Sequence, residues 1–479
     1  MPATTVERRA LAPDLEISRV VTGLWQIADM ERDGSVDAAA AAAAMQPYLD
    51  AGFTTFDMAD HYGSAEEIVG AYSGPSAHQA LTKWVPEPGP LDRAAVRAAV
   101  QRALDRLQTE RLDLLQFHSW NYWDPSYLDG LFYLRELCDE GLIGHLGMTN
   151  TDAAHMNVLL HSGVPVISDQ VCFSLIDRRP AGGLTRVCGE HDIALLGYGT
   201  LAGGFLSDRW LDQPEPRHPQ TWSQMKYKRF IDTAGGWDGL QRVLRAARTV
   251  ADRHDVSIAN VACRYVLEQP AVAAIIVGAR LGESEHIAST AGLFEFGLTA
   301  EDHAELNAAA DTLTPIPGDS GDEYRREPFL TASGDLSHHV NGFPPAYEVR
   351  DRDAGGRQVL SGTVWEDLAG FSRAVRRGDR VWVSGTTATH GDRVIGGADP
   401  EAQTHFIIDK IEGSLQSVGA RLEDVVRTRV YVRNAADWEP ISRAHGARFG
   451  AIQPANTLVE SPPIGDEYLV EIDAEALLP

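Results

Sequence analysis

The 479-residue sequence predicts an α/β fold, a TIM-type (β/α)8 barrel followed by a smaller α+β domain. The chain is too long for a single hydrophobic core, so at least two domains are expected. From the N-terminus to about residue 310, short β-branched apolar runs alternate with longer amphipathic runs, which is typical of repeated βα units. After about residue 355 the pattern changes to short alternating strands around two helices.

Eight strands can be counted in the first region, and eight strands separated by helices form a closed parallel barrel more often than an open sheet. Two intervening helices have N-cap residues, Asp92 before RAAVRAAVQRALDRL and Ser257 before IANVACRYVLEQ. The strands are expected near Thr22, Phe53, Leu81, Leu112, Ile143, Val166, Ile193 and Ile275.

The seventh βα connection, about residues 201–237, is unusually long and rich in aromatic residues. Long ordered loops are often lids or binding loops. Packing of the loop onto the barrel explains the same aromatic residues equally well, so both interpretations stay open. The residues concerned are Trp210, Trp222, Tyr227, Phe230 and Trp237.

Three segments are expected: a barrel over residues 1–330, a linker over 331–354 and a second domain over 355–479. The region from about 315 to 355 is rich in Pro, Gly, Asp and Ser and shows no sustained period. All seven methionines and all four cysteines precede the second domain. The linker's His338 and His339 stand in a polar stretch, and we assign no metal to them.

The composition limits the partners that the protein can have. With 44% hydrophobic and 23% charged residues it is typical of a globular protein. A formal net charge of −26 disfavours nucleic acid and anionic membranes, because both bind clustered Lys and Arg. The N-terminus has no apolar signal-like run, and no stretch approaches the roughly 18 uncharged apolar residues of a membrane helix. We therefore expect a cytoplasmic protein with reduced cysteines.

Four titratable side chains follow three successive strands of the predicted barrel. Asp57 and Tyr62 follow the second strand, Lys83 the third and His118 the fourth, and the C-terminal strand ends of such a barrel share one mouth. Reduction of a carbonyl group needs a proton for the oxygen, where negative charge develops. Tyr62 can donate it if the Lys83 ammonium lowers its pKa. Asp57 would hold Lys83, and His118 would donate a hydrogen bond to the carbonyl oxygen.

The motifs FDMADHYG, LTKW and QFHSW resemble those of the aldo-keto reductase superfamily, over roughly residues 10–330. The resemblance implies that the four residues form a catalytic tetrad and that the cofactor is NADP(H). It places the nicotinamide carboxamide on Thr149, Asn150 and Gln170, and the nicotinamide ring on Tyr198. The pyrophosphate contacts then fall on the backbone of Gly199, Thr200 and Leu201, with Gly203 nearby.

The cofactor's adenosine end should lie after the eighth strand, within IIVGARLGESEHIAST. There Arg280 occupies the position that commonly meets the 2′-phosphate, which favours NADPH over NADH because a guanidinium suits a phosphate in charge and geometry. The Gln and Asn that often hold adenine are not evident, and Ser284, His286 or Thr290 stand in their neighbourhood. A G-x-G-x-x-G motif after a first strand, as in a Rossmann site, is absent.

Aromatic residues on two loops are candidate substrate walls. Trp25 lies on the first loop, and Trp120, Tyr122 and Trp123 lie on the fourth. Such walls suit an apolar or planar carbonyl compound. The alternative is that some of these rings belong to the core.

Residues 355–479 resemble the RidA (YjgF) family, a chorismate-mutase-like α+β fold that assembles as trimers with ligand clefts between subunits. The matching motifs include GFSRAVRRGDRVWVSGTTA and QPANTLVESPPIGDEYLVEIDAEA. Phe371 stands where a Tyr is common, and Glu471 matches the family's acidic residue. Asn456 replaces the Arg that grips a substrate carboxylate, which makes imine hydrolysis doubtful. With 13 Lys plus Arg against 18 Asp plus Glu, this segment does not favour RNA.

The sequence thus predicts an NADPH-dependent oxidoreductase that reduces an aldehyde or ketone. Its RidA-like domain would form a homotrimer, or a multiple of one, and bind a small ligand. One alternative is an NADPH-binding redox sensor or scaffold with little turnover. Another is a two-step enzyme that couples imine or enamine hydrolysis to carbonyl reduction.

Overall fold

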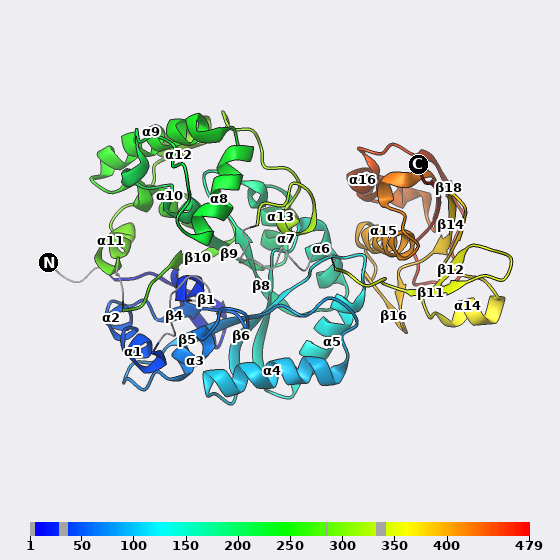
Figure 1. Cartoon of the computed structure of the whole chain (residues 1–479), viewed down its shortest axis with the longest axis horizontal. Helices are drawn as coiled ribbons and strands as arrows, with labels where there is room; N and C mark the ends of the chain where they lie inside the picture. The colour runs from blue at the N-terminus through cyan, green and yellow to red at the C-terminus, as the bar shows by residue number, and fades with distance from the viewer. Residues whose placement is uncertain (1–4, 28–36, 283–285, 332–341) are drawn as a thin grey trace.

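The computed structural model describes residues 5–27, 37–282, 286–331 and 342–479. It contains a barrel near the N-terminus and a smaller domain at the C-terminus (Figure 1). None of the described helices is both long and apolar enough to cross a membrane.

Eight parallel strands close the barrel in the order β10-β3-β4-β5-β6-β7-β8-β9. Each predicted strand is found, and the barrel prediction is confirmed. Closure is made by β10, which pairs with β3 from Ile275–Val20 to Gly278–Gly23. The strands are β3 (Val20–Gly23), β4 (Thr55–Asp57), β5 (Gln79–Trp84), β6 (Leu112–His118), β7 (Ile143–Thr149), β8 (Val166–Cys172), β9 (Ala194–Tyr198) and β10 (Val272–Gly278).

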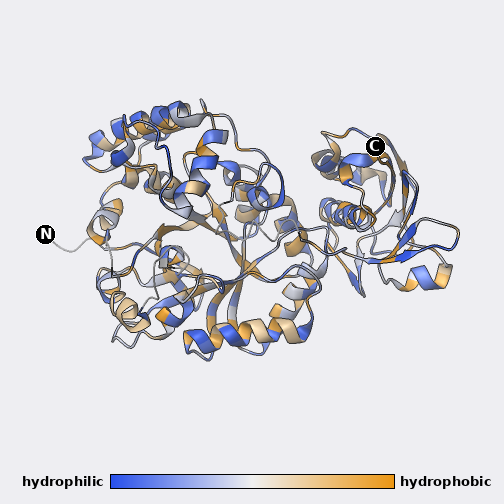
Figure 2. Ribbon diagram, viewed as in Figure 1, coloured by the Kyte–Doolittle hydropathy of each residue, from blue (hydrophilic) through white to orange (hydrophobic). Residues whose placement is uncertain are grey.

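Helices surround the barrel and turn one apolar side inward; in Figure 2 they carry both hydrophobic and hydrophilic residues. Both predicted caps are present: the Asp92 carboxylate accepts from the Ala95 amide at 2.7 Å, and the Ser257 hydroxyl accepts from the Asn260 amide at 3.1 Å. The helices are α1 (Ala38–Ala43), α2 (Gln46–Asp50), α3 (Ala65–Gly70), α4 (Arg93–Leu107), α5 (Ser126–Asp139), α6 (Ala153–His161), α7 (Gly183–Glu190), α8 (Trp222–Thr233), α9 (Gly236–His254), α10 (Ile258–Leu267), α11 (Ile287–Ala291), α12 (Ala300–Ala310) and α13 (Asp322–Arg325).

A hairpin that the sequence analysis did not anticipate precedes the barrel. Strands β1 (Arg8–Ala12) and β2 (Leu15–Ser18) pair antiparallel. Leu15 and Ile17 of β2 are buried in an apolar cluster with interior residues of the barrel strands. The hairpin therefore packs against the barrel interior.

The C-terminal domain is a seven-stranded mixed sheet, ordered β11-β12-β13-β14-β19-β17-β18, packed against α15. Only the β17–β18 pairing in this sheet is parallel. A two-stranded sheet, β15 (Thr389–His390) and β16 (Arg393–Val394), lies beside it. The other elements are β11 (Glu348–Asp351), β12 (Arg357–Leu360), α14 (Val364–Ala369), β13 (Ala374–Arg377), β14 (Arg380–Thr386), α15 (Pro400–Ser417), β17 (Val425–Val432), α16 (Trp438–Phe449), β18 (Ala455–Glu460) and β19 (Val470–Leu477).

The sheet of this domain begins inside the segment that we expected to be a linker. Strand β11 lies within residues 331–354, yet it pairs with β12 from Glu348–Leu360 to Asp351–Arg357. A strand needs a partner edge for its backbone groups, so β11 belongs to the domain. His338 and His339 lie outside the described residues.

The two domains meet through α6 of the barrel and α15 of the C-terminal domain. His155 lies 3.1 Å from Asp409 across this contact, and both side chains are buried. The Ser162 hydroxyl accepts from the Gly396 amide at 2.9 Å. The interface therefore contains buried polar contacts beside the apolar residues that the two domains share.

Candidate active site

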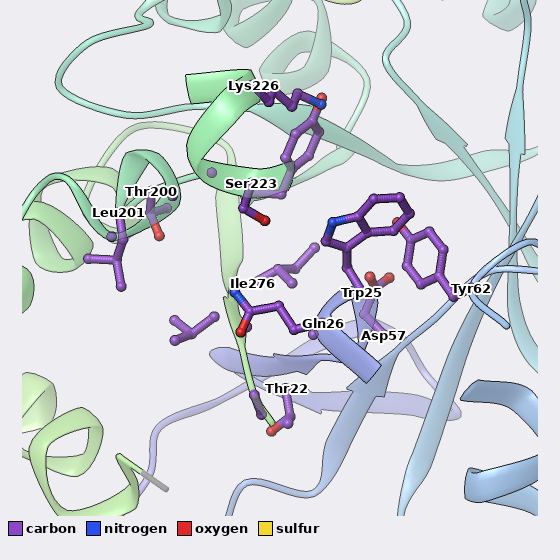
Figure 3. Close-up of a pocket in the computed structure, with 18 of the residues that line it drawn as sticks. Thr22, Trp25, Gln26, Asp57, Tyr62, Thr200, Leu201, Ser223, Lys226 and Ile276 are labelled. Atoms are coloured by element: carbon purple, nitrogen blue, oxygen red, sulfur yellow. The ribbon is translucent and has the colours of Figure 1, made fainter. Parts of the chain in front are cut away.

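A cavity of about 580 Å³ opens where the barrel strands end (Figure 3). Its wall includes all four residues of the predicted tetrad, two of the four candidate substrate residues and every predicted cofactor residue except Ser284, which lies outside the described residues. The predicted residues in the wall are Trp25, Asp57, Tyr62, Lys83, His118, Trp120, Thr149, Asn150, Gln170, Tyr198, Gly199, Thr200, Leu201, Gly203 and Arg280.

Asp57 at the end of β4 and Lys83 near the end of β5 form a buried ion pair. The Lys83 ammonium lies 2.7 Å from both carboxylate oxygens of Asp57 and donates to the Met58 carbonyl at 2.9 Å. Burial lowers the pKa of Lys83 from its ordinary value, and the Asp57 charge opposes that fall. The ammonium is thereby fixed in place.

Tyr62 lies between this ion pair and the first loop. The Lys83 nitrogen is 5.1 Å from the centroid of the Tyr62 ring. The ring of Trp25 meets that of Tyr62 edge-on at 4.8 Å, and Figure 3 shows the two side by side. A positive charge this close favours the phenolate form of a tyrosine.

His118, the last residue of β6, is buried beside two aromatic rings. The rings of Trp120 and Tyr324 meet it edge-on at 4.8 and 5.4 Å. Burial, followed by the charge of Arg325, holds the pKa of His118 well below its ordinary value. The imidazole is therefore neutral at pH 7, with one N–H to donate.

The predicted nicotinamide contacts are joined to the tetrad by hydrogen bonds. The Gln170 amide nitrogen donates to Asp57 at 2.7 Å and to Gln116 at 2.9 Å. With both amide hydrogens engaged, Gln170 offers its carbonyl oxygen as an acceptor. Tyr198 donates to the Asn150 side chain at 2.8 Å.

Two glycines after β9 are required by the backbone. Gly199 and Gly203 have φ values of +71° and +66°, in the left-handed region. A Cβ at Gly199 would also collide with the Tyr227 ring of α8. The loop can therefore follow the cavity wall closely, which suits backbone contacts to an anionic ligand.

Arg280 follows β10 at another part of the cavity wall. Its Nε donates to the Gln26 side chain at 3.3 Å. His286 and Thr290, two of the alternatives for an adenine contact, also line the cavity. Gln26 is a wall residue that the sequence analysis did not single out.

Comparison with known proteins identifies the family. The profile of the Aldo/keto reductase family matches residues 19–311. Protein tas of Escherichia coli is 30% identical over 241 residues, covering 46% of this chain and 68% of tas. The chain belongs to the aldo/keto reductase family. The glycerol dehydrogenase AKR11B4 of Gluconobacter oxydans aligns with a TM-score of 0.54 at 23% identity, over 67% of this chain and 98% of that one, which supports the barrel fold.

A second family covers the end of this aldo/keto reductase. The Endoribonuclease L-PSP profile, which describes RidA-like proteins, matches residues 365–478. The uncharacterized protein SCO2049 of Streptomyces coelicolor is 40% identical over 121 residues, 25% of this chain and 90% of SCO2049. The predicted fusion of two families is confirmed.

The long seventh loop of the aldo/keto reductase barrel has both of the roles left open for it, binding and packing. Trp222 and Tyr227 line the cavity. The rings of Trp210 and Trp237 pack at 5.7 Å from each other and on Phe205, away from the cavity. The loop is thus part cavity wall and part packing.

The fourth loop also divides, and here part of the expectation was wrong. Trp120 lines the cavity, and its indole N–H donates to the Pro86 carbonyl at 2.8 Å. Tyr122 instead stacks on His155 at 3.4 Å, and the Trp123 ring meets Phe343. These two rings face the domain interface because α15 and the chain leading into the second domain cover that side.

Two further wall residues were missed. Lys226 of α8 and Tyr324 of α13 are joined by a 2.6 Å hydrogen bond from the ammonium to the phenol oxygen. Tyr324 comes from the tail that the sequence analysis treated as an irregular segment. Tyr324 is the one aromatic residue in the polar run GDSGDEYRRE, and this was the available signal.

The three predicted RidA-like residues do not converge within one chain. Glu471 on β19 and Phe371 share a neighbour, Arg373, which lies 5.4 Å from the Phe371 ring and interacts electrostatically with Glu471. Asn456 lies on β18, separated from β19 by β17, where its side chain bonds Thr428 at 3.2 Å. Within one chain, Asn456 therefore lies apart from Phe371 and Glu471.

Proposed function

We propose that this aldo/keto reductase is an NADPH-dependent reductase of aldehydes or ketones. The observation that carries the proposal is the convergence of Asp57, Tyr62, Lys83 and His118 on one cavity wall. Four side chains of this kind supply a proton donor, a charge to tune it and an oxyanion partner, which together fit carbonyl reduction.

The residues divide the work as follows. The Tyr62 hydroxyl donates its proton to the carbonyl oxygen, because the Lys83 ammonium beside it stabilises the phenolate that results. The neutral His118 donates an N–H to the same oxygen and orients it. Asp57 keeps Lys83 protonated and in place. A bound nicotinamide cofactor supplies the hydride.

The described residues fit such a cofactor. Asn150 and Gln170 offer amide groups that can pair with a carboxamide, and the loop at 199–203 lines the cavity with backbone that can meet a pyrophosphate. Arg280 can meet a 2′-phosphate, which is our reason for proposing NADPH over NADH. Ser284 remains a candidate adenosine contact.

The test is NADPH consumption by the full chain against a panel of aldehydes, ketones and cyclic imines. Steady turnover with an aldehyde or ketone supports the reductase. Tight cofactor binding without turnover of any member would favour the sensor alternative, and turnover that needs an imine precursor would favour the two-step enzyme.

We further propose that the C-terminal domain forms a homotrimer, or a multiple of one, with ligand clefts between subunits. The described large apolar side chains that are exposed all lie in this domain, and burial against a second chain would remove them from water. They are Val364, Trp365, Leu368, Trp382, Val426, Trp438, Val459, Ile464 and Leu477. A trimer would also bring Asn456 of one chain to Glu471 of the next, as a cleft between subunits requires.

A further inference from the structure

A lysine that the tetrad mechanism does not use lies in the cavity wall. Lys226 is 7% exposed, and its ammonium donates to the Tyr324 hydroxyl at 2.6 Å. Its nitrogen also lies 4.7, 5.3 and 5.9 Å from the ring centroids of Tyr324, Tyr198 and Tyr227. Aromatic faces attract a cation, so these rings hold the ammonium in a defined position.

Lys226 is at the carbonyl end of the cavity rather than at the end proposed for the 2′-phosphate. Its hydrogen-bond partner Tyr324 has its ring 5.4 Å from that of His118, and Lys226 is among the charges that lower the pKa of His118, after burial and Arg325. Arg280, by contrast, bonds Gln26 beyond β10. Figure 3 shows Lys226 and Ser223 on one helix, above Trp25 and Tyr62 in this view.

The cavity wall has the opposite charge balance to the whole chain. The formal net charge of the protein is −26. Among the described wall residues, the one carboxylate is Asp57, and it is paired with Lys83. Arg209, Lys226 and Arg280 add three more cations. Behind the wall, Glu323 pairs with Arg179 and also interacts with Lys226. A cleft lined by one sign of charge concentrates ligands of the other sign.

We propose that Lys226 forms an anionic subsite, so that the preferred substrates are aldehydes or ketones that carry a carboxylate. This inference rests on the proposed reductase function. The carbonyl oxygen lies between Tyr62 and His118, and the carboxylate accepts a charge-assisted hydrogen bond from Lys226, with the Tyr324 hydroxyl as a second donor. The aromatic walls of Trp25 and Trp120 contact the part of the substrate between the two groups.

A matched pair of substrates tests the subsite on the full chain. The pair is 4-carboxybenzaldehyde and methyl 4-formylbenzoate, which differ by a charge and little else. We expect kcat/KM for the acid to exceed that for the ester by at least about tenfold, mainly because the acid has the lower KM. This acid-to-ester ratio should fall as the ionic strength rises. In Lys226→Met the acid-to-ester ratio should fall at least about tenfold, and Lys226→Arg should restore most of it.

The control is Lys228→Met on the same helix, since Lys228 pairs with Glu215 and Asp232 at the surface; its ratio should match the wild type. An ester turned over as well as the acid by the wild type would overturn the subsite and leave the reductase standing. An unchanged ratio in Lys226→Met, together with a weaker NADPH Kd, would instead assign Lys226 to the cofactor. If the wild type reduces no carbonyl compound, the proposed function itself fails.

Discussion

The barrel gathers its candidate site within one chain, whereas the C-terminal domain distributes its candidate site over separate strands. In the barrel, three successive strands and the loop after the first of them bring Asp57, Tyr62, Lys83 and His118 to one cavity. In the C-terminal domain, Asn456 is a strand away from the sheet position of Glu471, and large apolar side chains are exposed. We call the first region self-contained, because its candidate residues meet in one chain, and the second region distributed, because Asn456 lies apart from its other candidate residues.

Loss of the proton donor should have the largest effect on the self-contained region. We expect Tyr62→Phe to lower kcat by at least about 10²-fold, the low end for a positioned general acid, with little change in the NADPH Kd. Steady-state kinetics and cofactor titration measure the two. Tyr72→Phe is the control, because Tyr72 bonds Gln46 outside the cavity. Near-normal turnover in Tyr62→Phe would remove this residue from the acid role.

The second-largest effect is expected at the end of the same cavity that is proposed to bind the cofactor's 2′-phosphate. Arg280→Ala should weaken NADPH binding by about ten- to a hundredfold, the value of one charged hydrogen bond, and leave NADH almost unchanged. Fluorescence titration with both cofactors distinguishes the roles. Equal weakening of NADH would make Arg280 a structural residue, held by Gln26, and would remove the main support for NADPH.

A substitution in the C-terminal domain, the distributed region, should change the assembly of the protein and not its reductase activity. Trp382 is 41% exposed between Val381 and Val383, which are buried, so its ring lies on the open face of the sheet. We expect Trp382→Glu to reduce the solution mass from that of a trimer to that of one chain, about threefold, measured by light scattering. Gln101→Glu, on the exposed surface of α4 in the barrel, is the control. A wild-type chain that is already monomeric would contradict the trimer.

How much of this could be predicted from the sequence differs between the two regions. The barrel strands are short apolar runs and end in polar residues, so both the fold and the tetrad could be read from local patterns. The resemblance then supplied the cofactor residues, which local patterns alone would not have given. The RidA-like fold was predicted in the same way, but β11 was missed because a single edge strand in a polar segment has no distinct periodicity.

The misplaced and missed residues have one physical reason in common. Tyr122 and Trp123 looked like cavity walls because their loop carries Trp120, but the second domain packs against that loop. Lys226 and Tyr324 reach the cavity from segments about 100 residues apart. Contacts of this range depend on tertiary packing, which the spacing of residues along a chain does not encode.

The last and smallest effect concerns the contact that joins the two regions. Burial alone would lower the pKa of His155, but the carboxylates of Asp152 and Asp409 outweigh it and raise the pKa to about 9. Asp409 belongs to the C-terminal domain and also pairs with Arg448. His155 therefore joins the domains as an imidazolium, stacked on Tyr122.

The sign of the pH dependence follows from that shift. A histidine whose pKa is higher in the folded state stabilises fully below about pH 6.5 and loses the contribution as pH rises through about 9. Lys410 has the opposite effect. Burial and the charge of Arg373 lower its pKa to about 7, so its contribution to the stability of the folded state increases as the pH rises above that value. The wild-type profile is a sum of both, and only a difference between variants isolates His155.

We expect the melting temperature of the wild type to exceed that of His155→Gln by a few degrees at pH 6.5, and this gap to close as the pH approaches 9.5. Thermal unfolding across that range measures the gap. His145→Gln is the control, because His145 pairs with Asp14 at the surface, away from the interface. A gap that stays constant with pH would mean that His155 joins the domains by shape and hydrogen bonding rather than by charge, and that the two regions meet through a contact independent of protonation.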